Sequence, residues 1–140
     1  MNKIFSNYIN RDFSDIGRSN VISSNAILAS SHPIVSSVGI EVLKNGGNAV
    51  DAALAMNAVL CFAEPHMTGI GGDCFAMLSV DGRSANIKAL NGSGKASENA
   101  FASNLRDRNV SVISSEMPDA ITIPGAVAGW SLLHEEHGHM

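Results

Sequence analysis

The spacing of hydrophobic residues predicts two successive helices in the first half of the chain. Apolar positions between residues 34 and 43 recur with a helical period, and Gly46 and Gly47 are placed to end that helix, one of them in a left-handed conformation. A second helix is predicted over residues 52–63, with Asn48 as its N-cap and Asp51 near the first-turn amides. Because this second segment is apolar on nearly every side, we expect it to be buried between layers of structure.

Strand and turn signals surround these helices. Residues 26–29 form a short apolar run that predicts a buried strand, and we expect His32 to satisfy polar groups where this strand turns into the first helix. Residues 74–80 and 84–90 are predicted to form a hairpin, because the Asp-Gly pair between them strongly favours a tight turn.

The last third of the chain alternates between short elements. We expect a surface helix over residues 98–108, a strand over 120–123 and a final helix over 126–136 that ends at Gly138. One hairpin with two short strands cannot complete a large sheet. Either the domain is small and irregular, or further strands lie in sequence beyond this chain. The predicted class is α/β (α+β), with helices layered on an antiparallel or mixed sheet.

Composition and charge narrow the function classes. Charged residues make up 16% of the chain, against about 25% in typical soluble domains. Either the domain is compact and rich in alanine and glycine, or part of its surface is normally covered by more chain. The net charge of −4 and the lack of a basic stripe argue against nucleic-acid binding. No apolar run suits a signal peptide or a membrane span, so we expect a cytoplasmic protein with no membrane partner.

Two glycine-rich loops, at residues 69–72 and 91–94, are candidates for a ligand site. The first loop follows a helix and enters a strand, whereas a phosphate-binding loop leads from a strand into a helix. We interpret it as a tight turn near a ligand site, whose glycines allow positive φ and close backbone approach. His134 and His137 are three residues apart, which is not the spacing of a zinc helix, and the pattern indicates no metal and no cofactor.

No residue has the sequence context of a catalytic nucleophile. Ser93 lies between two glycines, but this is not the nucleophile elbow of the α/β-hydrolases. Cys61 and Cys74 have apolar neighbours and are interpreted as reduced core residues. The chain has two threonines, Thr68 and Thr122. The residues alone therefore indicate a glycine-rich α/β domain with no catalytic residue of its own.

Four segments, in this order and with similar gaps, resemble the gamma-glutamyltransferase (glutathione hydrolase) family. The resemblance covers residues 25–138, so we expect residues 25–140 to be the N-terminal portion of the large subunit and residues 1–24 to be an irregular arm. The four segments are Ala29-Ser30-Ser31-His32-Pro33, Gly46-Gly47-Asn48-Ala49-Val50-Asp51-Ala52-Ala53, Glu64-Pro65-His66-Met67-Thr68-Gly69-Ile70-Gly71-Gly72-Asp73 and Ile123-Pro124-Gly125-Ala126-Val127-Ala128-Gly129-Trp130.

The resemblance implies an N-terminal-nucleophile hydrolase with an αββα sandwich, incomplete in this chain. Members of the family cleave their own precursor into a large and a small subunit. The new N-terminal Thr of the small subunit attacks a gamma-glutamyl amide such as that of glutathione, with its own α-amine as base. The acyl group then passes to water or to an amino acid. The implied partners are a small gamma-glutamyl substrate and the missing small subunit, and the chain alone is expected to be inactive.

One departure from the family pattern falls in the substrate-binding segment. Typical members carry Leu-Asp-Gly-Arg-Glu-x-Ala-Pro after the hairpin, and the Arg clamps the α-carboxylate of the gamma-glutamyl group. Here Ser93 stands at the Arg position, as in a divergent Gly-Ser-Gly branch of the family. Ser93, Asn91 and Lys95 are the candidate substrate-binding residues, and Lys95 offers a point charge without the guanidinium fork.

Three alternatives remain open from the sequence. The substrate is glutathione, another gamma-glutamyl compound, or an acyl amide as in the related cephalosporin acylases. The chain is also interpretable as a non-catalytic fragment that acts only through a partner chain. A third reading is a free-standing ligand-binding domain built on the two glycine-rich loops.

Overall fold

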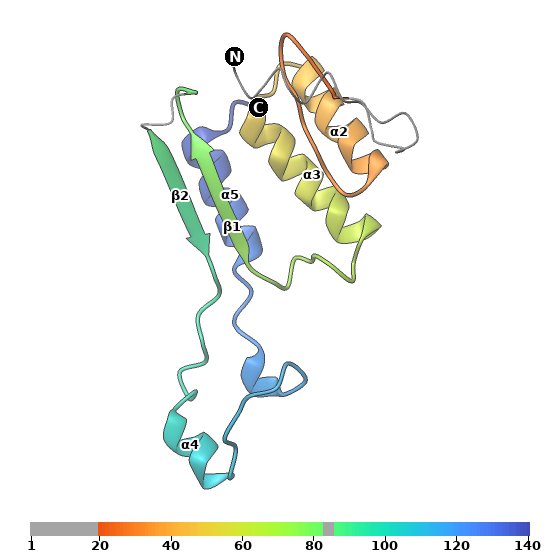
Figure 1. Cartoon of the computed structure of the whole chain (residues 1–140). Coiled ribbons are helices and arrows are strands. Elements are labelled where there is room, and N and C mark those ends of the chain that lie inside the picture. The colour runs from red at the N-terminus through yellow and green to blue at the C-terminus, as the bar shows by residue number, and fades with distance from the viewer. Residues whose placement is uncertain (1–19, 83–85) are drawn as a thin grey trace, which may run out of the picture.

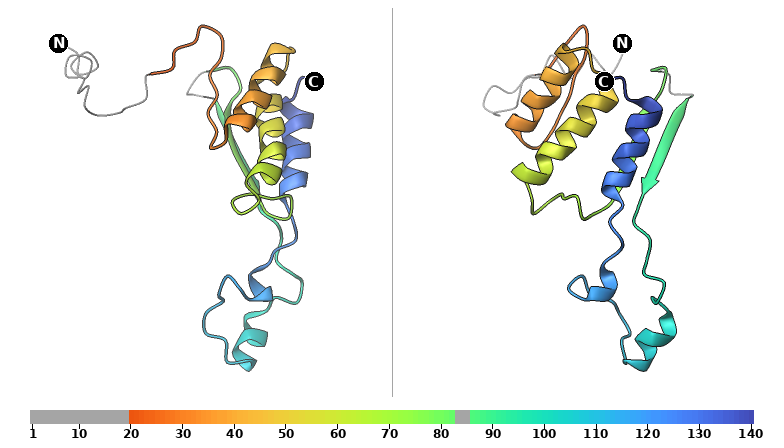
Figure 2. Two further views of the ribbon diagram at one scale, coloured as in Figure 1. Left: turned by 90° about the vertical axis from the view of Figure 1, so that its right-hand side faces the viewer. Right: turned by 180° about the vertical axis from the view of Figure 1, so that it is seen from behind.

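The computed structural model describes residues 20–82 and 86–140, and most of them form two layers (Figure 1). Three long helices make one layer and an antiparallel hairpin makes the other, as the side view of Figure 2 shows. A separate arm between the second strand and the last helix extends away from both layers (Figure 1). The elements are α2 (Pro33–Lys44), α3 (Ala49–Ala63), β1 (Cys74–Ser79), β2 (Ile87–Gly92), α4 (Ala102–Asp107), a 3₁₀ turn (Pro118–Ala120) and α5 (Ala126–His137).

Helix α2 begins and ends where its capping residues predict. The Nδ1 atom of His32 accepts a hydrogen bond of 3.2 Å from the Ile34 amide, so His32 is the N-cap. Gly46 follows the helix with φ of 95°, which confirms the predicted left-handed stop. Inside the helix, Gly39 lies against Met56 of α3, and a side chain at Gly39 would overlap the thioether. The sequence reading did not single out this close helix contact.

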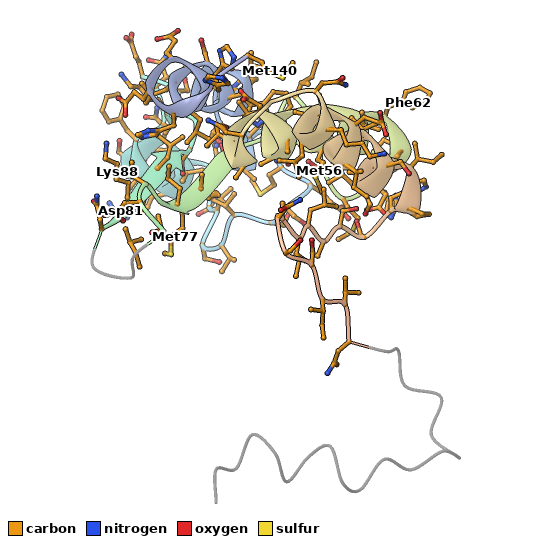
Figure 3. The ribbon with its side chains drawn as sticks, turned by 90° about the horizontal axis from the view of Figure 1, so that it is seen from above. Met56, Phe62, Met77, Asp81, Lys88 and Met140 are labelled. Carbon is orange, nitrogen blue, oxygen red and sulfur yellow. The ribbon has the colours of Figure 1, made fainter. Side chains whose placement is uncertain are left out.

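Helix α3 has the predicted capping box but not the predicted burial. The Asn48 side chain accepts from the amides of Val50 and Asp51, and Asp51 accepts from the Asn48 amide. The expectation that α3 is covered on nearly every side is wrong for the described residues, since Phe62 is 89% exposed and projects outward (Figure 3). The reason is that α2 and α5 cover only part of its circumference.

The hairpin forms with a longer connection than an Asp-Gly turn predicts. The strands are antiparallel, with Ser79 opposite Ile87 and Cys74 opposite Gly92. Beyond the ladder the Val80 amide donates to Asn86, so the turn is wider than two residues. Gly82 has φ of 69°, and residues 83–85 lie outside the described part of the chain.

Three other expected elements are wrong or shortened. Residues 26–29 are irregular, because no neighbouring strand among the described residues pairs with them. The expected strand at 120–123 is replaced by the 3₁₀ turn and an extended segment, with one backbone bond from Ile123 to the Lys95 carbonyl. The expected helix at 98–108 shortens to α4, whose N-cap residue Phe101 provides no capping side chain. The expected arm over residues 1–24 falls mostly on residues 1–19, outside the described part.

A buried carboxylate joins the start of α3 to the end of α5. Asp51 is 7% exposed, and its oxygens accept from the backbone amides of Asn48 (2.8 Å) and His139 (3.1 Å). Asn48 also donates its side-chain amide to the His137 carbonyl at 2.7 Å. Burial acts to raise the pKa of Asp51, but hydrogen bonds from the backbone amides of Asn48, His139 and Met140, together with the nearby His134, lower the pKa below its usual value.

This lowered pKa predicts an acid-dependent loss of stability. A carboxyl whose pKa is lower in the folded state stabilises the fold when ionised, so its contribution is full above the unfolded value of about 4. The contribution is then lost as the pH falls from about 4 through the folded pKa. Urea unfolding of the wild type and of Asp51→Asn between pH 6 and pH 2.5 measures this. We expect the stability difference between the two proteins to shrink with acid, and a constant difference would contradict the assignment.

Candidate functional site

Three segments that are distant in sequence meet at the open end of the hairpin. Residues 69–73 enter β1, residues 91–95 leave β2, and residues 122–126 lead into α5. The amides of Gly125 and Ala126 both donate to the Gly72 carbonyl, at 3.0 and 2.9 Å. The start of α5 is therefore fixed directly to the first glycine-rich loop.

The second glycine-rich loop is held between the other two segments. The Gly94 amide donates to Oδ1 of Asp73 at 2.7 Å, and the Lys95 carbonyl accepts from the Ile123 amide at 2.9 Å. A methyl group on Gly94 would overlap the Ile123 carbonyl, and one on Gly125 would overlap the Gly92 carbonyl. These glycines are required by close backbone approach and not by positive φ.

The first glycine-rich loop does not use its glycines as predicted. Gly69, Gly71 and Gly72 all have ordinary φ, and a Cβ on Gly69 or Gly71 would meet nothing within 4 Å. The positive φ that these glycines allow is therefore not adopted here. The loop approaches another segment closely at the Gly72 carbonyl, which accepts from the amides of Gly125 and Ala126. The loop borders an open surface hollow of about 350 Å³ lined by residues between Pro65 and Asp73.

The structure brings two of the three predicted substrate-binding residues together. Oδ1 of Asn91 accepts from the Ser93 amide at 3.0 Å and from the Ser93 hydroxyl at 2.6 Å. The Ser93 proton is thus used to stabilise the loop. Lys95 is exposed, and its ammonium group contacts no acceptor among residues 20–82 and 86–140. The polar donors left unpaired are the Asn91 amide NH₂ and the Lys95 ammonium group.

Asn91 lies on the face of the hairpin that no helix covers. The register places it opposite Phe75 and places Met77 opposite Ala89, so these side chains share one face. The other face packs on α5, where Gly129 lies against Cys74. Phe75 is 68% and Met77 is 77% exposed, and Met77 lies on the side away from α5 (Figure 3). The substrate-binding candidates therefore border an apolar, uncovered sheet face.

No catalytic nucleophile is assembled in the described part of the chain. All five histidines are described, and no imidazole nitrogen accepts a hydrogen bond from a hydroxyl or thiol; the Ser30 hydroxyl donates to the backbone carbonyl of His32 instead. Burial raises the pKa of the Cys74 thiol, and a hydrogen bond with Trp130 offsets this only in part. Both cysteines are free, as expected, but they are half-buried and not in the core as predicted. The site can bind polar groups but offers no activated atom to attack them.

Residues 20–82 and 86–140 contain neither a cluster of metal ligands nor a membrane-spanning helix. No three His, Cys, Asp or Glu side chains there converge on a point where a metal ion could bind. His134 instead lies 2.6 Å from the Met140 backbone oxygen, and His137 lies 3.5 Å from Glu136. None of the described helices is long and apolar enough to cross a bilayer.

Asp73 is the residue that the sequence reading missed. It stands directly after the first glycine-rich loop and bonds to the second loop, 21 residues further along the chain. The available signal was an isolated carboxylate between a glycine run and a strand. That signal does not identify a partner, because the pairing depends on how the hairpin returns.

Comparison with known proteins places these features in a family. The family model described as gamma-glutamyltranspeptidase matches residues 35–140. The glutathione hydrolase-like YwrD proenzyme of Bacillus subtilis is 35% identical over 120 residues, covering 86% of this chain and 22% of that protein. The acylase ACY 1 proenzyme of a Pseudomonas species (strain V22) is 35% identical over 118 residues, covering 76% of this chain and 20% of that protein. The chain thus spans about a fifth of the length of these relatives.

The fold agrees with this match. The crystal structure of Helicobacter pylori gamma-glutamyltranspeptidase superimposes with a TM-score of 0.75 at 30% identity, over 87% of this chain and 35% of that chain. This confirms the mixed α+β class and the expected relation to N-terminal-nucleophile hydrolases, of which the helical layer and the hairpin form one part. The chain belongs to the gamma-glutamyltranspeptidase family.

Proposed function

We propose that this chain supplies a substrate-binding part of a gamma-glutamyl hydrolase or transferase, while the nucleophile belongs to the rest of the enzyme. This proposal is supported mainly by the loop at residues 91–95. It presents unpaired donors beside an uncovered sheet face, and no histidine in the described part activates a hydroxyl or thiol. The chain's share of about a fifth of its relatives' length supports the same division.

In this proposal Lys95 and Asn91 bind the α-carboxylate of the gamma-glutamyl group. A carboxylate has four lone-pair sites, which suit the ammonium group and the Asn91 NH₂ donors. Ser93 has a supporting role, since its hydroxyl proton is already given to Asn91. An ammonium group lacks the parallel donors of guanidinium, so recognition is expected to be less strict than with Arg at this point.

The chemical steps are assigned to the part of the enzyme outside this chain. The N-terminal Thr hydroxyl of a small subunit attacks the amide carbon, and the Thr α-amine takes the hydroxyl proton. The amine leaving group departs with a proton, and water or an amino acid then cleaves the acyl-enzyme ester. The relatives' designation as proenzymes supports maturation by chain cleavage. The predicted cytoplasmic location belongs to this same proposal.

Titration with L-glutamine tests the binding role of the loop. Glutamine carries both the side-chain amide and the α-carboxylate of a gamma-glutamyl donor, and amide chemical shifts of residues 91–95 report its binding. We expect Lys95→Met to weaken binding about tenfold, because one charge-assisted hydrogen bond contributes roughly 1.5 to 3 kcal/mol. The control is Lys88→Met, which removes an equally exposed lysine from the same hairpin and is expected to leave the affinity unchanged.

The same titration separates the acylase alternative, which the match to acylase ACY 1 and the serine at position 93 favour. Butyramide has an amide but no carboxylate. If it binds as well as glutamine does, and Lys95→Met has no effect on either, the carboxylate assignment is wrong. An acyl-amide substrate is then the better conclusion.

A further inference from the structure

Asp73 makes a long-range hydrogen bond that joins the two glycine-rich loops. Its Oδ1 accepts from the Gly94 amide at 2.7 Å. Gly94 lies between Ser93 and Lys95, so this bond acts on the centre of the candidate binding loop. The residue before Asp73 is Gly72, whose carbonyl accepts from two amides at the start of α5. Asp73 therefore connects the loop to a rigid helix start.

The loop has few other restraints at this point. The Gly94 amide has Asp73 as its acceptor, and the backbone of Lys95 is held by one bond from Ile123. Gly94 also lies against the Ile123 carbonyl, whose carbon a Cβ would approach to 2.7 Å. The close backbone contact with Ile123 and the hydrogen bond to Asp73 therefore both act on Gly94. A hydrogen bond to a carboxylate is stronger than one between neutral groups.

We propose that Asp73 is a positioning residue, which fixes the geometry of residues 91–95 through the Gly94 amide without touching the substrate. The functional part of this inference rests on the proposed function, because it takes residues 91–95 to bind the substrate. The geometric part, that Asp73 holds the Gly94 amide, does not depend on it. Asparagine at position 73 offers an oxygen acceptor in the same place, whereas glutamate keeps the charge but moves the acceptor by one methylene. Positioning therefore predicts that Asp73→Asn is tolerated better than Asp73→Glu. A purely electrostatic role predicts the reverse order.

Two readouts on the 140-residue chain test the proposal. The first is hydrogen exchange of the Gly94 amide, with chemical shifts of the Ser93 and Lys95 amides. We expect Asp73→Ala to speed Gly94 exchange about tenfold, as the loss of one hydrogen bond with its acceptor implies. Asp73→Asn is expected to stay near the wild type, with Asp73→Glu between them. The control, Asp107→Ala, removes an exposed carboxylate of α4 that bonds to no described residue.

The second readout is the affinity for L-glutamine, which Asp73→Ala is expected to weaken several-fold and Asp73→Asn to restore. Unchanged loop amides in Asp73→Ala overturn the proposal, as does Asp73→Glu matching the wild type while Asp73→Asn does not. If Asp73→Ala fails to fold, the order of the Asn and Glu variants decides. If the wild type binds no glutamine, the proposed function of the loop fails, and Gly94 exchange still decides whether Asp73 holds it.

Discussion

Replacing Gly94 with alanine is expected to destabilise the chain by about 3 kcal/mol, at the upper end of the cost of overpacking. The added methyl group has no space, because it would overlap the Ile123 carbonyl oxygen and lie 2.7 Å from the carbonyl carbon. Backbone atoms cannot rotate aside as a side chain can. Relief would require Ile123 to move, which would break its bond to the Lys95 carbonyl. Urea unfolding followed by circular dichroism measures the loss.

Gly71→Ala is the matched control for this substitution. Gly71 also lies in a glycine-rich loop, has ordinary φ, and would place its Cβ in open space. We expect the stability of Gly71→Ala to stay within about 0.5 kcal/mol of the wild type, as for most surface substitutions. Equal effects of the two substitutions would show that the three segments do not meet as described.

Replacing Asp51 with alanine is expected to cost about 2 to 3 kcal/mol. The substitution removes one half of the capping box of α3, a loss of about 1 kcal/mol by itself. It also leaves the part-buried amides of Asn48 and His139 without their acceptor, and a fully buried unsatisfied donor costs roughly 1 to 3 kcal/mol. Partial hydration of these groups keeps the total below the sum. Urea unfolding near pH 7 measures the effect.

Amide hydrogen exchange and a control variant test the role of Asp51 further. Amide exchange at His139 and Met140 is expected to rise more than exchange within α2, because the end of α5 loses its attachment to α3. Glu98→Ala removes an exposed carboxylate that bonds to no described residue and serves as the control. A cost for Asp51→Ala as small as that of Glu98→Ala would mean that this carboxylate does not join the two helices.

The helices were predictable because their signals are local. The capping box of α3 needs only Asn48 and Asp51, and the stop of α2 needs only Gly46 in a left-handed conformation. Residues 26–29 and 120–123 were predicted as strands from composition, but a strand forms only where a partner lies beside it. The described residues provide no such partner.

The burial of α3 and the first glycine-rich loop show another limit of local patterns. An apolar circumference predicts that something covers α3, but not that the covering residues are in the same chain. Phe62 accordingly stays exposed, as do Phe75 and Met77 on the open face of the hairpin. Gly69 and Gly71 meet no neighbour among the described residues, so the reason for these glycines is not found in the contacts of this chain.

The contacts of the candidate site are likewise of two kinds: local ones within a few residues, and long-range ones between distant segments. Asn91 and Ser93 are two positions apart and form a local hydrogen-bonded turn, whereas their role in binding substrate stays a prediction. The bond from Gly94 to Asp73 and the contact of Gly94 with Ile123 join segments more than 20 residues apart. They follow from the return of the hairpin and the approach of α5, which no sequence window contains. The family resemblance was recognisable because its four motifs are short and local, and the comparisons confirm it.

The most direct test measures release of aniline from a gamma-glutamyl anilide by the purified 140-residue chain, after its mass has been verified. The proposal predicts no release above the uncatalysed rate at any pH between 6 and 9, since residues 20–82 and 86–140 offer a site for the donor but no activated hydroxyl. Sustained turnover that disappears in Ser93→Ala, with no other polypeptide in the sample, would contradict it.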